Sequence, residues 1–282
     1  MKIIEGFNLV NKKLTEAGAE SPAFDTSELI SFVLNTPYTP ALDKEQEICA
    51  EDTAKLLNLA ERRAKGEPLQ YILGQWEFYG FPFKVGKGVL IPRDDTEVAL
   101  RASFEHLDNI KNPKILDLCA GSGTLSVTLK KLYPEAEVTA VEISDDACFY
   151  LKENAKLNSA DINLINEDIF KVYGDFKDRY FDLIISNPPY LTTEELKTMQ
   201  KELYFEPELA LDGGDDGLIF YRRIVPLYTP KLKWGGQLIF ELDGSQAEYT
   251  RELMKAENYG DIEIFDDLGG IHRAIKGTLF EF

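Results

Sequence analysis

The sequence predicts an α/β protein with a mainly parallel sheet of seven strands and helices on both faces. From residue 114 onward, short apolar runs alternate with segments of helical periodicity, a pattern typical of parallel strands joined by helices. Only residues 266–272 separate the last two strands, which is too short for a helical crossover, so the last strand should be antiparallel. The first 70 residues carry no strand pattern and predict a separate helical bundle.

The helical bundle, residues 1–70, is expected to contain three helices. Apolar residues repeat at helical spacing in the segment that ends at Gly18. Asp25 or Thr26 should cap a second helix, which ends at Leu34. A third helix is expected from about Lys44 to Lys65.

A β-hairpin connector and the α/β domain are expected to follow. Residues 71–92 cluster aromatic side chains around Gly80 and Pro82 and predict the hairpin. The α/β domain, residues 93–282, should open with a helix capped by an Asp or Thr of residues 94–97. Its expected strands are 115–118, 138–143, 162–165, 181–186, 237–242, 262–265 and 273–279, and its helices are 124–132, 145–157, about 218–232 and 245–256.

Composition limits the class of protein. No apolar run approaches the roughly 18 residues of a membrane helix, and the N-terminus lacks the pattern of a secretory signal. Three cysteines without close spacing and only two histidines argue against a disulfide framework or a metal centre, and favour a reducing cytoplasm. The net charge of −18, with 31 basic residues among 49 acidic ones, disfavours a nucleic-acid surface and leaves room for a basic protein partner.

The Asn-Pro-Pro-Tyr motif at residues 187–190 follows the predicted buried strand 181–186. Pro188 and Pro189 remove two backbone donors and fix the path of the chain. An amide from Asn187, an unpaired carbonyl and the Tyr190 ring would then meet at the carboxyl edge of the sheet. Such a cluster can hold a planar –NH2 group, but a rigid turn followed by a packed tyrosine explains these residues equally well.

Residues 117–123, Glu142 and Asp168 predict a nucleoside site at the same edge. The glycines of the turn let a ligand approach the backbone, and the missing lysine disfavours a phosphate ligand. Glu142 ends the next strand, where it can accept both ribose hydroxyls. Asp168 could accept from an adenine amino group or simply cap a helix, and Ile169 could pack on the ring. The predicted cofactor-binding residues are Asp117, Cys119, Ala120, Gly121, Ser122, Gly123, Glu142, Asp168, Ile169 and Asn187, and S-adenosylmethionine is a ligand of this kind.

These motifs resemble the Rossmann-like methyltransferases that depend on S-adenosylmethionine. More narrowly, the chain resembles the HemK/PrmC family, which methylates a glutamine side chain in peptide-chain release factors. Further segments that carry the narrower likeness are residues 66–72, 77–80, 91–93, 95–97 and 206–211.

Some positions depart from the family pattern. Asp94 stands where proline is usual, and Cys119 and Ala120 where Gly-Thr is common. Glu142 replaces a frequent aspartate, and Ile169 stands where an aromatic residue can occur. None of these changes removes a group that the chemistry needs.

The resemblance implies that the substrate is the glutamine of a Gly-Gly-Gln motif in class 1 release factors, and that the activity supports translation termination. The Asn187 side-chain oxygen and the Pro188 carbonyl would accept the two amide hydrogens, and Tyr190 would pack against the glutamine. No metal is implied. The predicted catalytic residues are Asn187, Pro188 and Tyr190, and the predicted substrate-binding residues are these three with Pro189.

Two other functions remain compatible with the residues alone. The acceptor could be an exocyclic amine of adenine or guanine in DNA or RNA, which the acidic composition disfavours. The chain could also be a module that binds the cofactor without catalysis, which the intact Asn-Pro-Pro-Tyr motif disfavours. The helical bundle and the hairpin are expected to help recognise the protein substrate.

Overall fold

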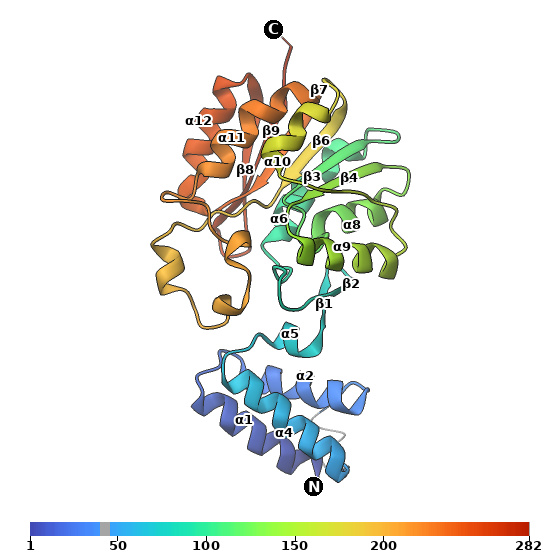
Figure 1. Ribbon diagram of the computed structural model, residues 1–282, viewed down its shortest axis with the longest axis vertical. Coiled ribbons are helices and arrows are strands. Elements are labelled where there is room, and N and C mark those ends of the chain that lie inside the picture. The colour runs from blue at the N-terminus through green and yellow to red at the C-terminus, as the bar shows by residue number, and fades with distance from the viewer. Residues whose placement is uncertain (40–45, 282) are drawn as a thin grey trace. The chain divides into compact units, whose positions relative to one another are not determined.

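The computed structural model describes residues 1–39 and 46–281. Over these residues the chain forms two compact units (Figure 1). The helical unit comprises Met1–Gln75 together with Gln200–Phe205, and the sheet unit comprises Trp76–Met199 together with Glu206–Phe282. A short segment far along the sequence therefore belongs to the helical unit.

The second helix begins earlier than the sequence predicts. α2 starts at Pro22, after Ser21, so the predicted caps at Asp25 and Thr26 are wrong. Proline suits the first turn of a helix because its missing N–H would have no helical partner there. Asp25 lies inside the helix and is buried. The helices of this unit within the described residues are α1 (Ile3–Glu16), α2 (Pro22–Leu34), α4 (Ala50–Ala64) and α5 (Leu69–Leu73).

The third predicted helix begins later than expected. Residues 46–49 are not helical, and α4 starts at Ala50. The Cys49 sulfur caps it by accepting the Asp52 N–H at 3.3 Å. The expected start at Lys44 lies outside the described residues. The short helix α5 was not predicted.

A buried ion cluster joins the parts of the helical unit. Arg63 on α4 donates to Asp25 on α2 (2.7 Å) and to Glu202 in the segment 200–205 (2.5 Å). Burial raises the pKa of Asp25, and the Arg63 guanidinium opposes this rise. Because Arg63 contacts both Asp25 and the partly exposed Glu202, it links α2, α4 and the segment 200–205 within this unit.

The predicted hairpin is present at the start of the sheet unit. β1 (Gln75–Phe78) and β2 (Phe81–Lys84) flank Tyr79 and Gly80, which both have positive φ, as the favoured two-residue hairpin turn requires. The helices α6 (Thr96–Ala102) and α7 (Phe104–Leu107) follow. Asp95 occupies the N-cap position of α6 but makes no capping hydrogen bond. Asp95 is therefore not the predicted capping residue. Its carboxylate pairs instead with Arg273 at 3.3 Å.

The main sheet confirms the predicted fold class. In the described residues it has seven strands in the order β5-β4-β3-β6-β7-β9-β8, and β9 alone runs opposite to the others. The strands of this sheet and the α-helices between them are β3 (Lys114–Leu118), α8 (Thr124–Leu132), β4 (Glu137–Glu142), α9 (Asp145–Leu157), β5 (Asn163–Asn166), α10 (Ile169–Val172), β6 (Phe181–Ser186), α11 (Ile219–Tyr228), β7 (Leu232–Glu241), α12 (Ala247–Ala256), β8 (Tyr259–Asp266) and β9 (His272–Leu279).

Three bounds in the sheet unit differ from the predicted ones by three or more residues. β8 begins at Tyr259 rather than Ile262, and the other two lie between α11 and β7. The helix expected to reach Leu232 ends at Tyr228, and β7 begins at Leu232 rather than Gln237. Pro230 lies in the short 3-10 turn Thr229–Lys231 between them.

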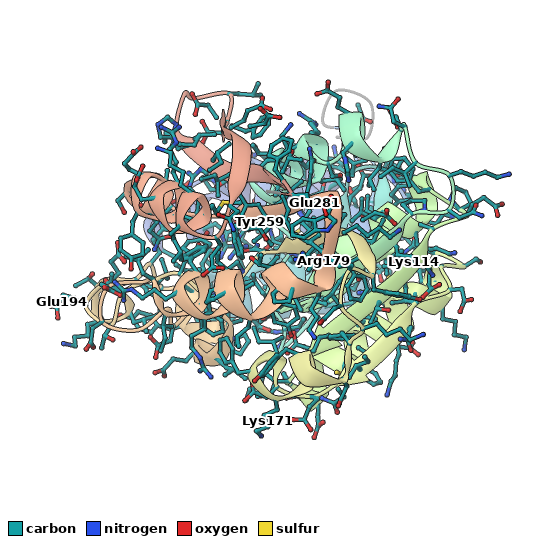
Figure 2. The ribbon with its side chains drawn as sticks, turned by 90° about the horizontal axis from the view of Figure 1, so that it is seen from above. Lys114, Lys171, Arg179, Glu194, Tyr259 and Glu281 are labelled. Carbon is teal, nitrogen blue, oxygen red and sulfur yellow. The ribbon has the colours of Figure 1, made fainter. Side chains whose placement is uncertain are left out.

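Two apolar layers enclose the sheet. Leu183 and Ile185 of β6 pack in the layer that contains residues of α6 and α8, whereas Ile184 packs in the layer of α11 and α12. This alternation follows from the two-residue period of a strand. Figure 2 shows Lys171 and Glu194 at the outside of the unit, while Tyr259, which is buried, lies within it.

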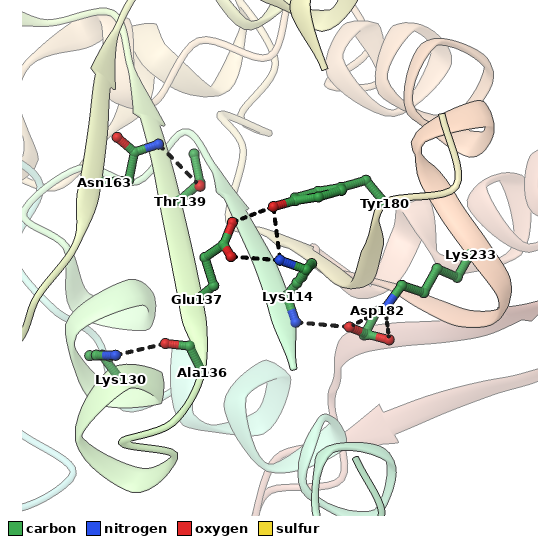
Figure 3. A network of polar contacts seen from close by, with 9 residues as sticks. All are labelled: Lys114, Lys130, Ala136, Glu137, Thr139, Asn163, Tyr180, Asp182 and Lys233. Carbon is green, nitrogen blue, oxygen red and sulfur yellow. Dashed lines mark hydrogen bonds and ion pairs between the residues drawn. The ribbon is translucent and has the colours of Figure 1, made fainter. Parts of the chain in front are cut away.

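Polar contacts fix the amino edge of the sheet, where β3, β4 and β6 begin (Figure 3). The Lys114 ammonium donates to Glu137 (2.6 Å) and to the Tyr180 hydroxyl (2.8 Å). The Lys114 N–H and the Lys233 ammonium both donate to Asp182, at 2.7 to 2.8 Å. Lys114, Glu137, Asp182 and Lys233 therefore each have a partner of opposite charge.

Among the described residues, no helix combines the length and the apolar character needed to cross a membrane.

Candidate active site

A cavity of about 230 Å³ lies at the carboxyl edge of the sheet. A smaller one of about 40 Å³ shares Leu90, Cys119, Gly121 and Asn187 with it, so the two cavities are adjacent. Of the predicted site residues, Cys119, Gly121, Glu142, Asp168, Ile169, Asn187 and Pro189 line the larger cavity. Asp117, Ala120 and Ser122 line the smaller one. Gly123, Pro188 and Tyr190 line neither of these two cavities.

The turn after β3 coils tightly between the strand and α8. Cys119, Gly121 and Gly123 all have positive φ. A side chain at Gly121 would meet no atom within 4 Å, so this glycine is needed for its backbone conformation. At Gly123 a Cβ atom would lie 2.9 Å from Leu151, so this glycine allows α9 to pack close to the turn.

Glu142 is held by backbone donors. Its two carboxylate oxygens accept the N–H groups of Gly121 and Ser144, each at 2.8 Å. Burial raises the pKa of Glu142, and these N–H donors counteract the rise. Glu142 lines the larger cavity, and its carboxylate retains acceptor capacity for a hydroxyl group of a ligand.

Asp117 is buried near the end of β3, and within the described part of the chain only one of its two carboxylate oxygens accepts a hydrogen bond. Its Oδ2 accepts the Ser126 N–H at 3.0 Å. Among the described residues, Oδ1 is buried without a hydrogen-bond partner. Burial raises the pKa of Asp117 to about 7. An unpaired oxygen beside the smaller cavity suits a ligand that brings a positive charge or an N–H donor.

The residues after β5 form an apolar wall with one acid. The Asp168 carboxylate accepts the Phe170 N–H at 2.8 Å and so caps α10, which was one of the two predicted roles for this residue. Asp168 also lines the cavity, together with Ile169, Phe170 and Phe220. Phe170 therefore supplies an aromatic surface next to the position where Ile169 replaces one.

Asn187 lies where the cavities meet and faces a residue that the sequence did not suggest. Its Nδ2 donates to the Thr96 hydroxyl at 3.3 Å. Thr96 is the first residue of α6 and is buried. Pro188 and Pro189 are also buried, so the turn after β6 has little freedom.

The Tyr190 hydroxyl points to a buried acid. The hydroxyl donates to Glu241 at 3.5 Å. The main-chain oxygen of Tyr190 accepts from Gln246 at 2.8 Å. Burial raises the pKa of Glu241 to about 7. Desolvation, and next the charge of Glu241, raise the pKa of Tyr190 far above its usual value, so the phenol stays protonated.

A further wall was missed by sequence reasoning. Residues 88–90, Pro207, Leu209 and Ala210 line the larger cavity. Glu206 links these two segments. Its carboxylate accepts the Ile91 N–H at 2.9 Å and pairs with Arg93. The sequence marks these segments only through the family likeness, because a buried pair separated by more than a hundred residues leaves no local pattern.

Neither a thiol nucleophile nor a metal ligand set is present at this edge in the part of the chain that the structure describes. Burial raises the pKa of the Cys119 thiol well above its usual value, so the thiol stays neutral. No group of three or more His, Cys, Asp or Glu residues that could hold a metal ion occurs in residues 1–39 and 46–281.

The fold and the cavity define a Rossmann-like methyltransferase, and residues 92–214 match the family model described as the methyltransferase small domain. Residues 7–74 match the model of the PrmC N-terminal domain. The release factor glutamine methyltransferase of Fusobacterium nucleatum subsp. nucleatum is 37% identical over 98% of this chain and 81% of its own length. That of Geobacter sulfurreducens is 38% identical over 94% of this chain and 93% of its own length. The chain belongs to the release factor glutamine methyltransferase family.

Solved structures support the fold. A methyltransferase from Pyrococcus furiosus matches with a TM-score of 0.53 and 16% identity, over 72% of this chain and 91% of that one. The T. thermophilus 16S rRNA N2 G1207 methyltransferase, solved with AdoMet and guanosine, matches with a TM-score of 0.53 and 17% identity, over 73% of this chain and 49% of that one.

Proposed function

We propose that this protein transfers a methyl group from S-adenosylmethionine to the side-chain amide nitrogen of the glutamine in the Gly-Gly-Gln motif of class 1 peptide-chain release factors. The observation that carries the proposal is that Glu142 and Asn187 line the same cavity of about 230 Å³. One end suits a nucleoside and the other suits a planar amide. Membership of the release factor glutamine methyltransferase family favours a protein over a nucleic acid as the acceptor.

The residues of the larger cavity fit the cofactor. The Glu142 carboxylate keeps acceptor sites for the ribose hydroxyls, and the apolar wall of Ile169, Phe170 and Phe220 suits an adenine ring. The unpartnered Oδ1 of Asp117 beside the smaller cavity suits the amino group of the methionine part. When bound, S-adenosylmethionine supplies a methyl group activated by a sulfonium charge.

Asn187 and Pro188 orient the acceptor. An amide nitrogen is a poor nucleophile because its lone pair is delocalised into the carbonyl group. The Asn187 side-chain oxygen and the Pro188 carbonyl accept the two amide hydrogens and thereby direct the nitrogen lone pair at the methyl group. The sulfur–carbon bond breaks as the nitrogen–carbon bond forms, and the nitrogen then loses a proton to water. S-adenosylhomocysteine is the other product.

The helical unit and the hairpin contribute to recognition of the release factor in this proposal. The net charge of −18 favours a partner with a basic surface. The reaction then belongs to the cytoplasm, where translation terminates.

The test is methyl transfer from radiolabelled S-adenosylmethionine with three acceptors offered separately: a purified class 1 release factor, DNA and ribosomal RNA. We expect label in the release factor and loss of that label when the glutamine of its Gly-Gly-Gln motif is replaced by alanine. Label in a nucleic acid alone would overturn the proposal, and so would label that persists in the release factor without this glutamine.

A further inference from the structure

We propose that Gln246 is a positioning residue that clamps the carboxyl end of the Asn-Pro-Pro-Tyr turn and so fixes where Pro188 and Tyr190 meet the acceptor. The proposal rests on the function given above, in which the Pro188 carbonyl accepts an amide hydrogen and Tyr190 packs against the glutamine. Gln246 lies outside the motif, in the short 3-10 turn Gly244–Gln246 that precedes α12, and it is 5% exposed.

The prolines of the turn cannot anchor it to the surrounding chain. Pro188 and Pro189 have no N–H, so neither main chain can donate a hydrogen bond. The amino end of the turn is fixed by β6, whose last residue, Ser186, pairs with Phe240 of β7. The carboxyl end lies beyond β6, so its position depends on donors from other segments.

The Gln246 amide supplies such a donor. Its Nε2 donates to the main-chain oxygen of Tyr190 at 2.8 Å and to that of Gly217 at 3.1 Å. One buried NH2 group therefore ties the last residue of the motif to the segment that leads into α11.

Two donors on the other side hold the amide in this orientation. Gln246 Oε1 accepts the Asp243 N–H at 3.1 Å and the Tyr221 hydroxyl at 3.2 Å. The Tyr221 hydroxyl shares its proton with the main-chain oxygen of Glu241, at 3.0 Å. Burial raises the pKa of Tyr221 well above its usual value, so the phenol remains a donor. Because an N–H only donates and a main-chain oxygen only accepts, a flipped amide would lose these bonds.

Two glycines let the chain approach the Tyr190 main chain closely. A Cβ atom at Gly217 would lie 2.4 Å from the Tyr190 oxygen and 2.4 Å from Gln246 Nε2. A Cβ atom at Gly213 would lie 2.7 Å from the Tyr190 Cα. A side chain at either position would therefore displace Tyr190 or break its bond to Gln246.

Gln237 on β7 is a matched control for Gln246. It is also buried, and its Nε2 donates to the Thr278 hydroxyl at 3.2 Å. It lines neither of the two cavities at the carboxyl edge. In Gln246→Glu and in Gln237→Glu an oxygen replaces the NH2 group, so each variant loses its donors, keeps an acceptor and gains a buried carboxyl group.

Gly235 is a matched control for Gly217. Its φ of +79° is close to the +70° of Gly217, so an alanine is strained to a similar degree at both positions. A Cβ atom at Gly235 would meet no atom of the described residues within 4 Å. The comparison of Gly217→Ala with Gly235→Ala therefore isolates the contact with Tyr190 and Gln246.

The first experiment measures kcat, the acceptor KM and the cofactor Kd of these variants, on whichever acceptor the wild type labels. For Gln246→Glu and Gly217→Ala we expect kcat to fall about 10- to 100-fold, because a small displacement of groups that orient a substrate slows turnover strongly. The cofactor Kd should stay within about threefold, which a general loss of structure would not allow. Gln237→Glu and Gly235→Ala should keep the wild-type kcat.

Hydrogen exchange tests the clamp independently of turnover. The Leu191 N–H donates to the Leu211 oxygen at 2.9 Å, and the Gly213 N–H donates to the Leu191 oxygen at 2.8 Å. Both N–H groups therefore report on the segments beside Tyr190. In Gln246→Glu their exchange should become about tenfold faster, whereas exchange in β6 should match the wild type.

Three results would overturn the proposal: a wild-type kcat in Gln246→Glu, an equal loss of kcat in Gln237→Glu, or wild-type exchange of the Leu191 and Gly213 amides in Gln246→Glu. If Gln246→Glu does not fold, Gly217→Ala decides in its place, against Gly235→Ala. If the wild type labels a nucleic acid instead of a release factor, or labels no acceptor, the proposed function fails while the exchange comparison still tests the clamp.

Discussion

The charged groups at the two edges of the sheet differ in whether they have partners. At the amino edge, Lys114, Glu137, Asp182 and Lys233 meet partners of opposite charge (Figure 3). At the carboxyl edge, Asp117 and Glu241 are buried without a cationic partner in direct contact, and each keeps an oxygen without a hydrogen-bond partner, among the residues that the structure describes. The pKa of each is raised to about 7.

This difference indicates which edge is built for stability and which for a ligand. Paired charges at the amino edge lower the free energy of the folded chain by themselves. Unsatisfied acids at the carboxyl edge raise it, and they are tolerated because the apolar layers of the sheet supply the stability. Substitutions at the carboxyl edge should therefore change activity, whereas substitutions at the amino edge should change stability.

The largest expected effect is on turnover when the acceptor amide is removed. Asn187→Ala should lower kcat about 100- to 1,000-fold, because the amide hydrogens of the substrate lose an oriented acceptor. The cofactor Kd should stay within about threefold. Steady-state methylation and equilibrium binding measure the two quantities. Asn163→Ala, which removes an amide that donates to the Thr139 hydroxyl at the amino edge, should leave both unchanged; a comparable loss there would contradict the contrast between the edges.

The next effect is on cofactor affinity. Glu142→Ala should raise the Kd for S-adenosylmethionine about 10- to 100-fold, because it removes charged acceptors for hydroxyl groups. The kcat at saturating cofactor should change by less than about threefold. Glu137→Ala at the opposite end of β4 is the control, and isothermal calorimetry gives the affinity. An unchanged Kd in Glu142→Ala would exclude a direct contact with the ribose.

A pH dependence of cofactor affinity should follow from Asp117. Burial raises the pKa of this acid to about 7, so below that pH it is mostly protonated in the free protein. A cationic amino group favours the ionised form, so binding releases a proton. The affinity should therefore rise about tenfold per pH unit as the pH increases toward 7 and become constant above it.

Calorimetry in two buffers of different ionisation enthalpy checks this proton release. In Asp117→Asn the group does not titrate, so the affinity should be lower and independent of pH over the same range. A wild-type affinity that does not change between about pH 5.5 and 7 would contradict a charge contact at Asp117.

The smallest effect is expected at the amino edge. Asp182→Asn removes the charge opposite the half-exposed Lys233 but keeps an oxygen for the Lys114 N–H. The free energy of unfolding should decrease by about 1 kcal/mol. Thermal or denaturant unfolding measures it. The kcat/KM should not change, and a loss of turnover without a loss of stability would show that this edge takes part in the reaction.

Local patterns were sufficient to find each strand of the main sheet, although not every bound, and the glycine turn after β3. The apolar run of β6 predicted its bounds correctly, because both faces of this strand are buried and turn residues follow it. The turn at residues 117–123 was identified because its glycines are needed where they stand. The α2 start was wrong because Asp25, which has the character of a cap, pairs with Arg63 on another helix.

The supporting groups of the site could not be found in this way. Thr96, Glu206 and Glu241 come from separate segments, and each was found only through a partner distant in sequence. A threonine at a helix start or an acid at a strand end is common by itself. The information that distinguishes them is their burial beside the cavity, which only the folded chain provides.

The membership of Gln200–Phe205 in the helical unit has a consequence for how such proteins can be recombined. The helical unit is a discontinuous domain, so a single cut near residue 75 does not isolate it. A fragment of residues 1–75 would leave Arg63 with Asp25 but without Glu202. A chimera that exchanges only the N-terminal part between relatives would also separate this arginine from its native acid. Transfer of the intact helical unit of this chain therefore requires two segments to be moved together.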